Sequence, residues 1–329
     1  MRYFARKIAF FLATLWAAIT LNFIIPRLQP GDPAEVMVQK LAGKDAQLNP
    51  AAVQAMRTML GTPDGSLFEQ YVAYLRALVQ GDFGISYTYY PYPVTEVIGN
   101  ALPWTLVLVG VTQVLAFVIG ITLGAYAAWR RNSRFDSIVT LGSTFLGTLP
   151  SFWIALLLLF VFGYTVGWFP TGGGYSVTTP GLNGAFLADA AYHSLLPALS
   201  LLITAPVGWI LGMRNTMVMN LGEDYIRLAK AKGLPDRVVA LRYAARNALL
   251  PSVTGFAIAL GSVLGGSILV EKIFDYPGMG RLMDEAIGNR DFPLLQTLLL
   301  FIIVAVLVAN LIADLLYGVL DPRARRSES

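Results

Sequence analysis

The stretch from Asn220 to Pro251 reads NLGEDYIRLAKAKGLPDRVVALRYAARNALLP and separates two long apolar runs. With Arg214 just before it, the stretch brings together seven Lys or Arg residues and only three acids, which are Glu223, Asp224 and Asp236. A cationic segment between two membrane-length runs is expected to stay in the cytoplasm, because positively charged loops are translocated poorly. The stretch therefore indicates a membrane protein and predicts on which side this loop lies.

The first half of the stretch has the pattern of a short capped helix. Asn220 is placed to cap its N-terminus, with Glu223 three residues later, as in a capping box. Lys230 and Lys232 fall in the last turn, and Gly233 suits a left-handed C-terminal cap before a proline. We predict a rigid cytoplasmic helix between two spans. Another protein could bind such a helix and displace it together with the spans.

The composition is that of an integral membrane protein. Apolar residues make up 56% of the 329 residues, charged residues 13%, and the mean hydropathy is +0.60. Each apolar run of about 18 or more residues can cross roughly 30 Å of hydrocarbon. The qualifying runs are Ile8–Ile25, Ala101–Trp129, Ile138–Tyr164, Leu195–Met213, Ala248–Val270 and Leu294–Ala313. We therefore expect an all-α integral membrane protein with six transmembrane helices and with the cytoplasmic helix between spans four and five.

The basic residues predict the orientation of these spans. Of the 24 Lys and Arg residues, 16 lie in gaps on one side and eight in gaps on the other. We therefore expect a multi-pass protein of the cytoplasmic (inner) membrane with both termini in the cytoplasm. The expected divisions are a first transmembrane helix (1–26), an extracytoplasmic helical insertion (27–100), a five-helix core (101–321) with a cytoplasmic loop at 214–247, and a cytoplasmic tail (322–329).

Within the insertion, Pro50–Leu60 and Leu67–Gln80 have helical patterns, and we expect two or three short helices there. Inside the spans, a few residues are candidates for either helix packing or the lining of a pathway. Packing is the expected role and pathway lining is the alternative. These residues are Gln113 in span two and Gly261, Gly265 and Gly266 in span five.

The sequence lacks the residues that several kinds of site require. It has no cysteine, so a thiolate metal site is excluded. Its one histidine, His193, has no second histidine, cysteine or carboxylate cluster nearby from which a metal site or a Ser-His-Asp triad could be built, and it is expected to be a hydrogen-bonded packing residue. Gly43 and Lys44 are followed by Asp45, which excludes a P-loop. No ionisable residue is expected in the middle of a span, which argues against a self-contained channel or ion-coupled carrier. No basic–aromatic patch indicates nucleic-acid binding.

Several distinctive motifs follow one another along the chain: PGDP (30–33), GDFGIS (81–86), DYIRLAKAKG (224–233), RNALLP (246–251), GGSILVEKIFDYPGMG (265–280), RDFP (290–293) and NLIADLLYGVLDPR (310–323). In these motifs and their order, the chain resembles the permease subunits of ABC importers of the dipeptide/oligopeptide/nickel family over nearly its whole length. Arg-Leu-Ala at 227–229 stands where the wider superfamily shows Glu-Ala-Ala. In this difference the chain resembles the peptide branch of the superfamily.

The resemblance implies a six-span subunit that pairs with a second, homologous permease subunit in the lipid bilayer. Two ABC ATPase subunits would bind from the cytoplasm and hold the ATP and Mg, so that this chain is not an enzyme and carries no cofactor. An extracytoplasmic solute-binding protein would deliver the substrate. The resemblance also implies an ATPase-coupling role for Glu223, Asp224, Tyr225, Arg227, Leu228, Ala229, Lys230, Ala231, Lys232, Gly233 and Leu234.

The function implied is that of half a translocation pathway for di- and oligopeptides. Import of oligosaccharides or nickel by the same machinery is the alternative for the cargo. A self-contained channel or ion-coupled carrier is the remote alternative for the mechanism.

Overall fold

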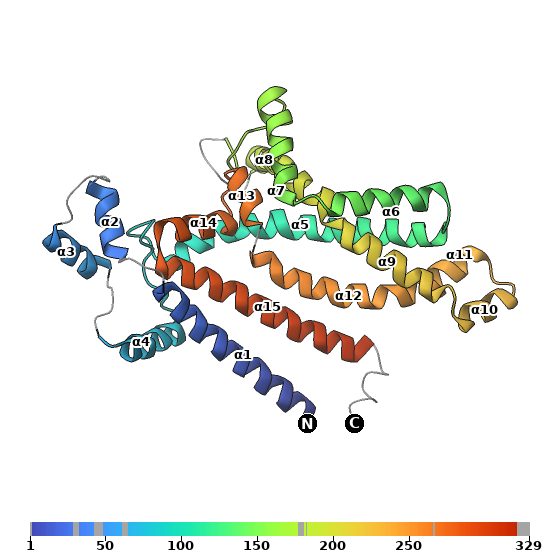
Figure 1. Ribbon diagram of the computed structural model, residues 1–329, viewed down its shortest axis with the longest axis horizontal. Helices are drawn as coiled ribbons and strands as arrows, with labels where there is room; N and C mark the ends of the chain where they lie inside the picture. Colours follow the sequence, from blue (N-terminus) through green and yellow to red (C-terminus); the bar gives the residue numbers. More distant parts are fainter. Residues whose placement is uncertain are drawn as a thin grey trace. The chain divides into compact units, whose positions relative to one another are not determined.

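A computed structural model describes residues 2–28, 33–42, 49–60, 65–176, 181, 183–265 and 267–320 (Figure 1). Over these residues the regular elements are helices, and the one β-type pairing is an isolated bridge between Ile85 and Pro93. Two compact units are present: Met1–Trp104 with Pro277–Leu307, and Thr105–Tyr276 with Val308–Ser329. The helices are α1 (Arg2–Arg27), α2 (Pro33–Ala42), α3 (Pro50–Leu60), α4 (Leu67–Gln80), α5 (Val94–Trp129), α6 (Arg134–Gly147), α7 (Ser151–Leu158), η1 (Leu159–Thr165), α8 (Gly184–Thr204), α9 (Pro206–Asn220), α10 (Asp224–Ala231), α11 (Asp236–Val238), η2 (Val239–Ala245), α12 (Arg246–Gly261), η3 (Ser262–Gly265), α13 (Ile268–Ile273), α14 (Met279–Asn289) and α15 (Phe292–Leu320).

Five helical stretches are long and apolar enough to cross a membrane, and a bent pair of helices makes a sixth if it counts as one span. The five are Ile8–Ile25, Val94–Trp129, Gly184–Asn220, Asp236–Ile273 and Phe292–Ala313, and the bent pair is Arg134–Gly147 with Ser151–Thr165. The prediction of an all-α integral membrane protein is confirmed.

The third predicted span, Ile138–Tyr164, is not one continuous helix. Its two halves form an angle of 91°. Pro150, at the junction, has extended backbone (φ −63°, ψ 139°) and is the N-cap residue of α7. Proline has no N–H to continue the helix before it and disfavours helical backbone in the residue that precedes it. The predicted span Ile138–Tyr164 is therefore present as a bent pair of helices, and apolar run length alone does not show where such a span bends.

The fifth predicted span, Ala248–Val270, is also interrupted. The helix α12 ends at Gly261, the 3-10 turn η3 follows, and α13 begins at Ile268. Gly261 is buried and Gly265 is half-buried in η3, whereas Gly266 lies outside the described residues. Glycine is a weak helix former, so a glycine at each end of η3 favours a break there.

In the first unit, the helices expected in the insertion are present as α2, α3 and α4. A reciprocal cap begins α4: the Glu69 N–H donates to the Ser66 hydroxyl (3.3 Å) and the Ser66 N–H donates to the Glu69 carboxylate (2.8 Å). The hydrogen bonds from Ser66 hold the pKa of the Glu69 carboxyl below its ordinary value. The other end of α4 closes on Gly81 in the left-handed conformation (φ 73°).

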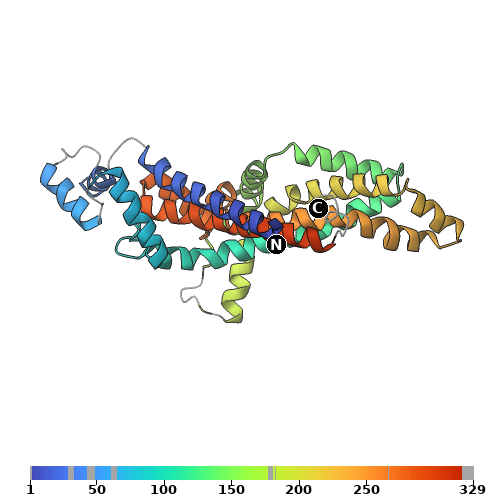
Figure 2. The same cartoon turned by 90° about the horizontal axis from the view of Figure 1, so that it is seen from below.

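Asp291 joins the GDFGIS and RDFP motifs in the same unit. Its buried carboxylate accepts hydrogen bonds from the Ser86 hydroxyl and the Thr88 N–H (2.8 Å) and also caps α15 through the Leu294 N–H (3.2 Å). The helices α1 and α15 lie side by side (Figures 1 and 2), and the Asn22 amide donates to the Gln296 carbonyl at 2.7 Å.

Candidate coupling site

The predicted short helix is α10, Asp224–Ala231, but its N-terminal cap differs from the prediction. Asn220 is the last residue of α9, and its side-chain amide donates to the Ala244 carbonyl at 3.4 Å. Glu223 occupies the cap position of α10 without a side-chain capping hydrogen bond. The capping prediction for Asn220 was wrong, because α9 continues to this residue and a turn separates it from α10.

The C-terminal end of α10 confirms the predicted glycine cap. Gly233 is left-handed (φ 72°), its N–H donates to the Lys230 carbonyl (2.9 Å), and the Leu234 N–H donates to the Ala229 carbonyl (3.3 Å). These two hydrogen bonds form a Schellman motif, which satisfies carbonyls that the helix leaves free. A Cβ at Gly233 would meet no atom within 4 Å, so the requirement for glycine arises from the backbone angle alone.

One face of α10 is attached to its own chain. Ile226 and Ala229 are 1% and 3% exposed and belong to a buried cluster with Val239, Ala240, Ala244 and Ala248 of η2 and α12, Met213 and Met217 of α9, and Ala128 of α5. The spacing of three residues places both side chains on one side of the helix. Ala229 therefore packs α10 against η2 and α9 and is not part of the exposed surface of the helix, and its coupling role stays a prediction.

The opposite face of α10 is free within the described residues. Leu228 is 58% and Tyr225 37% exposed. The predicted coupling residues that are exposed are Glu223, Asp224, Tyr225, Arg227, Leu228, Lys230, Ala231, Lys232 and Gly233, while Leu234 is half-buried. The exposed surface therefore combines acidic and basic groups with the side chains of Tyr225 and Leu228.

The helix α9, which leads into α10, approaches α5 closely at two glycines of α5. A Cβ added at Gly120 would lie 2.3 Å from the Trp209 Cβ, and one added at Gly124 would lie 2.4 Å from the Ile210 carbonyl oxygen. Only glycine permits this approach at either position. Sequence reasoning selected the glycines of span five and missed this pair, although glycines four residues apart in an apolar helix are a known signal of close packing.

An ion pair joins α6 to α9 and was also missed. The Arg214 Nε and Nη2 donate to the two Asp136 carboxylate oxygens at 2.6 and 2.9 Å. Asp136 also accepts hydrogen bonds from the Asn132 N–H (3.0 Å) and the Thr140 hydroxyl (3.2 Å). The two partners are 78 positions apart in sequence, so no local pattern pairs them.

Gln113, a candidate for packing or pathway lining, is half-buried in α5. One turn later, the Phe117 ring stacks on Phe256 of α12 (centroid distance 4.3 Å) and meets Trp209 of α9 edge-on (5.2 Å). Three helices thus meet at an aromatic cluster, which supports the packing interpretation of this face of α5.

Two polar residues of the second unit, Glu271 and His193, have hydrogen-bond partners within that unit. Glu271, which the sequence placed in a loop, is fully buried in α13 and accepts a hydrogen bond from Thr105 of α5 (3.1 Å). The His193 Nδ1 lies 2.9 Å from the Asp189 carbonyl oxygen, as expected for a hydrogen-bonded packing residue.

Comparison with known proteins decides the family. A family model described as "Binding-protein-dependent transport system inner membrane component" matches residues 120–326, from Gly120 through α10 to beyond α15. The chain belongs to this family. As a member, it is a multi-pass membrane subunit of a binding-protein-dependent transport system, and the resemblance inferred from its motifs is confirmed. Such a system implies partner ATPase and solute-binding protein subunits.

Relatives match this family member over their full length. It is 38% identical over 326 residues to the oligopeptide transport system permease protein AppB of Bacillus subtilis, with 98% of each chain covered. It is 34% identical to the di/tripeptide transport system permease protein DppB of Pseudomonas aeruginosa and 33% identical to the glutathione transport system permease protein GsiC of Escherichia coli, with 99% of each chain covered in both cases. These relatives are permease subunits and not enzymes.

Proposed function

We propose that this chain is the permease subunit of an ATP-driven importer of di- and oligopeptides and that it forms half of the translocation pathway with a second, homologous permease. The observation that carries the proposal is its full-length identity of 33 to 38% to permeases named for oligopeptides, di/tripeptides and glutathione. Each of these cargoes is a peptide, so peptide cargo is favoured over an oligosaccharide or nickel.

In this proposal the exposed face of α10 docks on a partner ATPase, and both termini lie in the cytoplasm. The partner ATPases bind ATP and Mg, and this chain binds no cofactor. The buried face of α10 supports the idea, because Ile226 and Ala229 attach the helix to η2 and α9. A push on α10 would therefore move these elements together and switch the pathway by rigid-body displacement of packed helices.

Reconstitution into liposomes tests the proposal. The complete importer should take up radiolabelled short peptides when ATP and the binding protein are supplied. Uptake should stop when this chain is omitted, and nickel or oligosaccharides should not compete. Peptide flux through this chain alone, without ATP, would favour a channel or carrier. Uptake of nickel or an oligosaccharide in place of peptide would favour the alternative cargo.

A further inference from the structure

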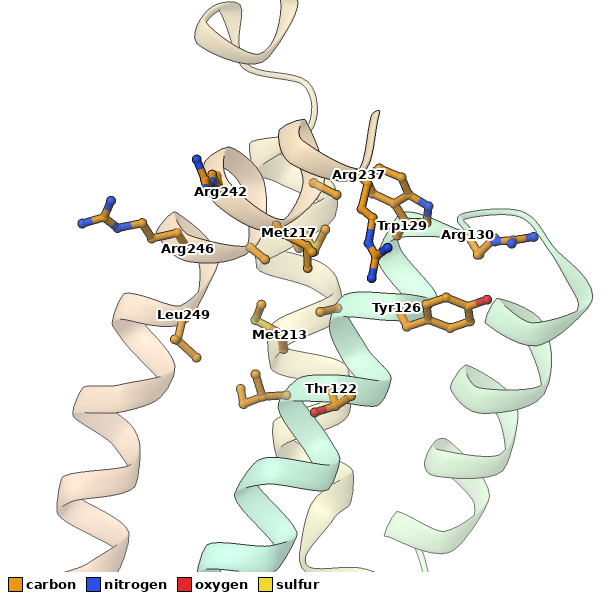
Figure 3. Close-up of a pocket in the computed structure, with 15 residues that line it drawn as sticks. Thr122, Tyr126, Trp129, Arg130, Met213, Met217, Arg237, Arg242, Arg246 and Leu249 are labelled. Carbon is orange, nitrogen blue, oxygen red and sulfur yellow. The ribbon is translucent and has the colours of Figure 1, made fainter. Parts of the chain in front are cut away.

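A cavity of about 870 Å³ opens beside the elements that support α10 (Figure 3). It is formed by α5, α9, α11, η2 and the start of α12. Its wall is largely apolar and includes Ile121, Ala125, Met213, Met217, Ala240 and Leu249. The volume is in the range of sites for small organic molecules, roughly 300–1,000 Å³.

The mouth of this cavity is basic. Arg130, Arg237, Arg242 and Arg246 are among the lining residues, and none of the lining residues is acidic. In Figure 3 the Arg237 side chain extends beside Trp129 toward Tyr126, whereas the guanidinium groups of Arg130, Arg242 and Arg246 point away from the apolar wall. Within the described part of the chain, none of the four pairs with a carboxylate.

The location of the mouth matches the boundary between hydrocarbon and headgroups. It lies at the end of α5, whose apolar span finishes at Trp129, and Tyr126 and Trp129 are the aromatic types that gather at this boundary. Arginine side chains at such a level extend toward the headgroups and leave apolar surface behind them. In the orientation proposed above, this boundary faces the cytoplasm, where the leaflet carries anionic lipid.

An apolar wall with an acid-free basic mouth fits an amphiphile whose charged end is negative. We propose that this cavity binds an anionic phospholipid, with acyl chain against the wall and phosphate among the arginines. Basic pockets between transmembrane helices on the cytoplasmic side are a known environment for such headgroups. A wholly polar anion would leave the apolar wall of the cavity uncovered. A zwitterionic lipid would gain less electrostatic binding energy from several unpaired arginines than an anionic lipid would.

The bound lipid would contact the support of the coupling helix directly. Met213, Met217 and Ala240 line the cavity and also belong to the cluster that buries Ile226 and Ala229 of α10. The lipid would therefore complete the packing around η2 and α9, which α10 would displace in the proposed mechanism. ATP-driven transport should for this reason depend on anionic lipid.

Native mass spectrometry of the full chain and of the assembled importer, titrated with phosphatidylglycerol or phosphatidylcholine, tests the site. The double variant Arg242→Gln/Arg246→Gln should lower the affinity for phosphatidylglycerol about 25-fold, since each basic residue near an anionic headgroup contributes about fivefold. Affinity for phosphatidylcholine should change little. The matched control is Arg131→Gln/Arg134→Gln, which removes two exposed charges near the same helix end without touching the cavity and should change either affinity less than twofold.

A second variant obstructs the cavity with a bulky side chain and leaves the buried cluster intact. Thr122 is exposed on α5 and lines the cavity, so Thr122→Trp should displace phosphatidylglycerol while the chain keeps its normal membrane level. Equal loss of lipid in both double arginine variants, or equal binding of the two lipids by the wild type, would overturn the proposal. Binding to the isolated chain that disappears in the assembled importer would show that a partner subunit occupies the cavity.

Discussion

The Arg214 guanidinium holds the Asp136 carboxylate with two hydrogen bonds, at 2.6 and 2.9 Å, and thereby ties the start of α6 to α9 shortly before α10. The Asp136 side chain is only 5% exposed and that of Arg214 21%. Because both hydrogen bonds run between rigid helices, α6 should follow when α9 moves. In the proposed mechanism, the pair would therefore help to support α10.

We expect Asp136→Asn to destabilise the solubilised protein by about 1–3 kcal/mol, because it leaves the Arg214 charge in place without its partner. Arg214→Gln should cost a similar amount, and the double variant should cost less than the sum. Thermal unfolding of all three variants measures this coupling. Asp224→Asn is the control: the Asp224–Arg227 pair has side chains 97% and 76% exposed, and its loss should not be measurable in stability. Strict additivity of the two single changes would show that the Asp136–Arg214 pair contributes nothing.

We expect Gly124→Ala to force α5 and α9 apart, because the new Cβ would lie 2.4 Å from the Ile210 carbonyl oxygen. The cost should be about 1–3 kcal/mol or more, seen as a lower membrane level and a lower melting temperature. Gly99→Ala is the matched control in the same helix, since a Cβ there meets nothing within 4 Å and alanine favours helix. Equal stability of the two variants would contradict the close packing at Gly124.

The spans and the end of α10 could be predicted because their signals are local. The length of an apolar run and the placing of Gly233 before Pro235 act within a few residues. The Asp136–Arg214 pair could not be predicted in this way, because its partners are 78 positions apart and meet only when α6 packs on α9. The error at Asn220 has the same origin: its local pattern fits a cap, but the packing of α9 carries that helix through this residue.

The membrane sidedness stays a prediction, and the cysteine-free chain suits a labelling test. Single cysteines at Tyr175 and Asp284 should react with an impermeant maleimide added outside. Cysteines at Asn132 and Asp236 should react only after the membrane is opened, because the Lys and Arg count places their loops in the cytoplasm. Positions 44 and 327 should follow the outside and inside groups respectively, although they lie outside the described residues. Outside labelling at position 236 would reverse the proposed orientation.

We expect Gly233→Val to reduce ATP-driven uptake steeply while membrane level stays normal. The left-handed angle at Gly233 costs a residue with a Cβ roughly 1 kcal/mol, enough to misdirect a short helix but not to unfold the bundle. Gly233→Asn is the control, because asparagine adopts this conformation more readily and should keep most of the uptake. Equal uptake in both variants would show that the Schellman cap does not position α10.

Substitutions at the two alanines of α10 distinguish an effect on ATPase docking from an effect on folding. Ala231 is exposed, so Ala231→Asp should leave the membrane level near normal while it weakens co-purification of the ATPase, because it places an acid between Lys230 and Lys232 on the proposed docking face. Ala229 is 3% exposed in the cluster with η2 and α9, so Ala229→Asp places an unpaired charge in the core. That change should cost about 3–5 kcal/mol and lower the membrane level itself. The measurement is the ratio of co-purified ATPase to permease in each variant, together with the permease level.

A normal ratio and normal uptake in Ala231→Asp would exclude the exposed face of α10 as the docking surface. A normal membrane level in Ala229→Asp would show that the buried face of α10 does not hold the helix in place.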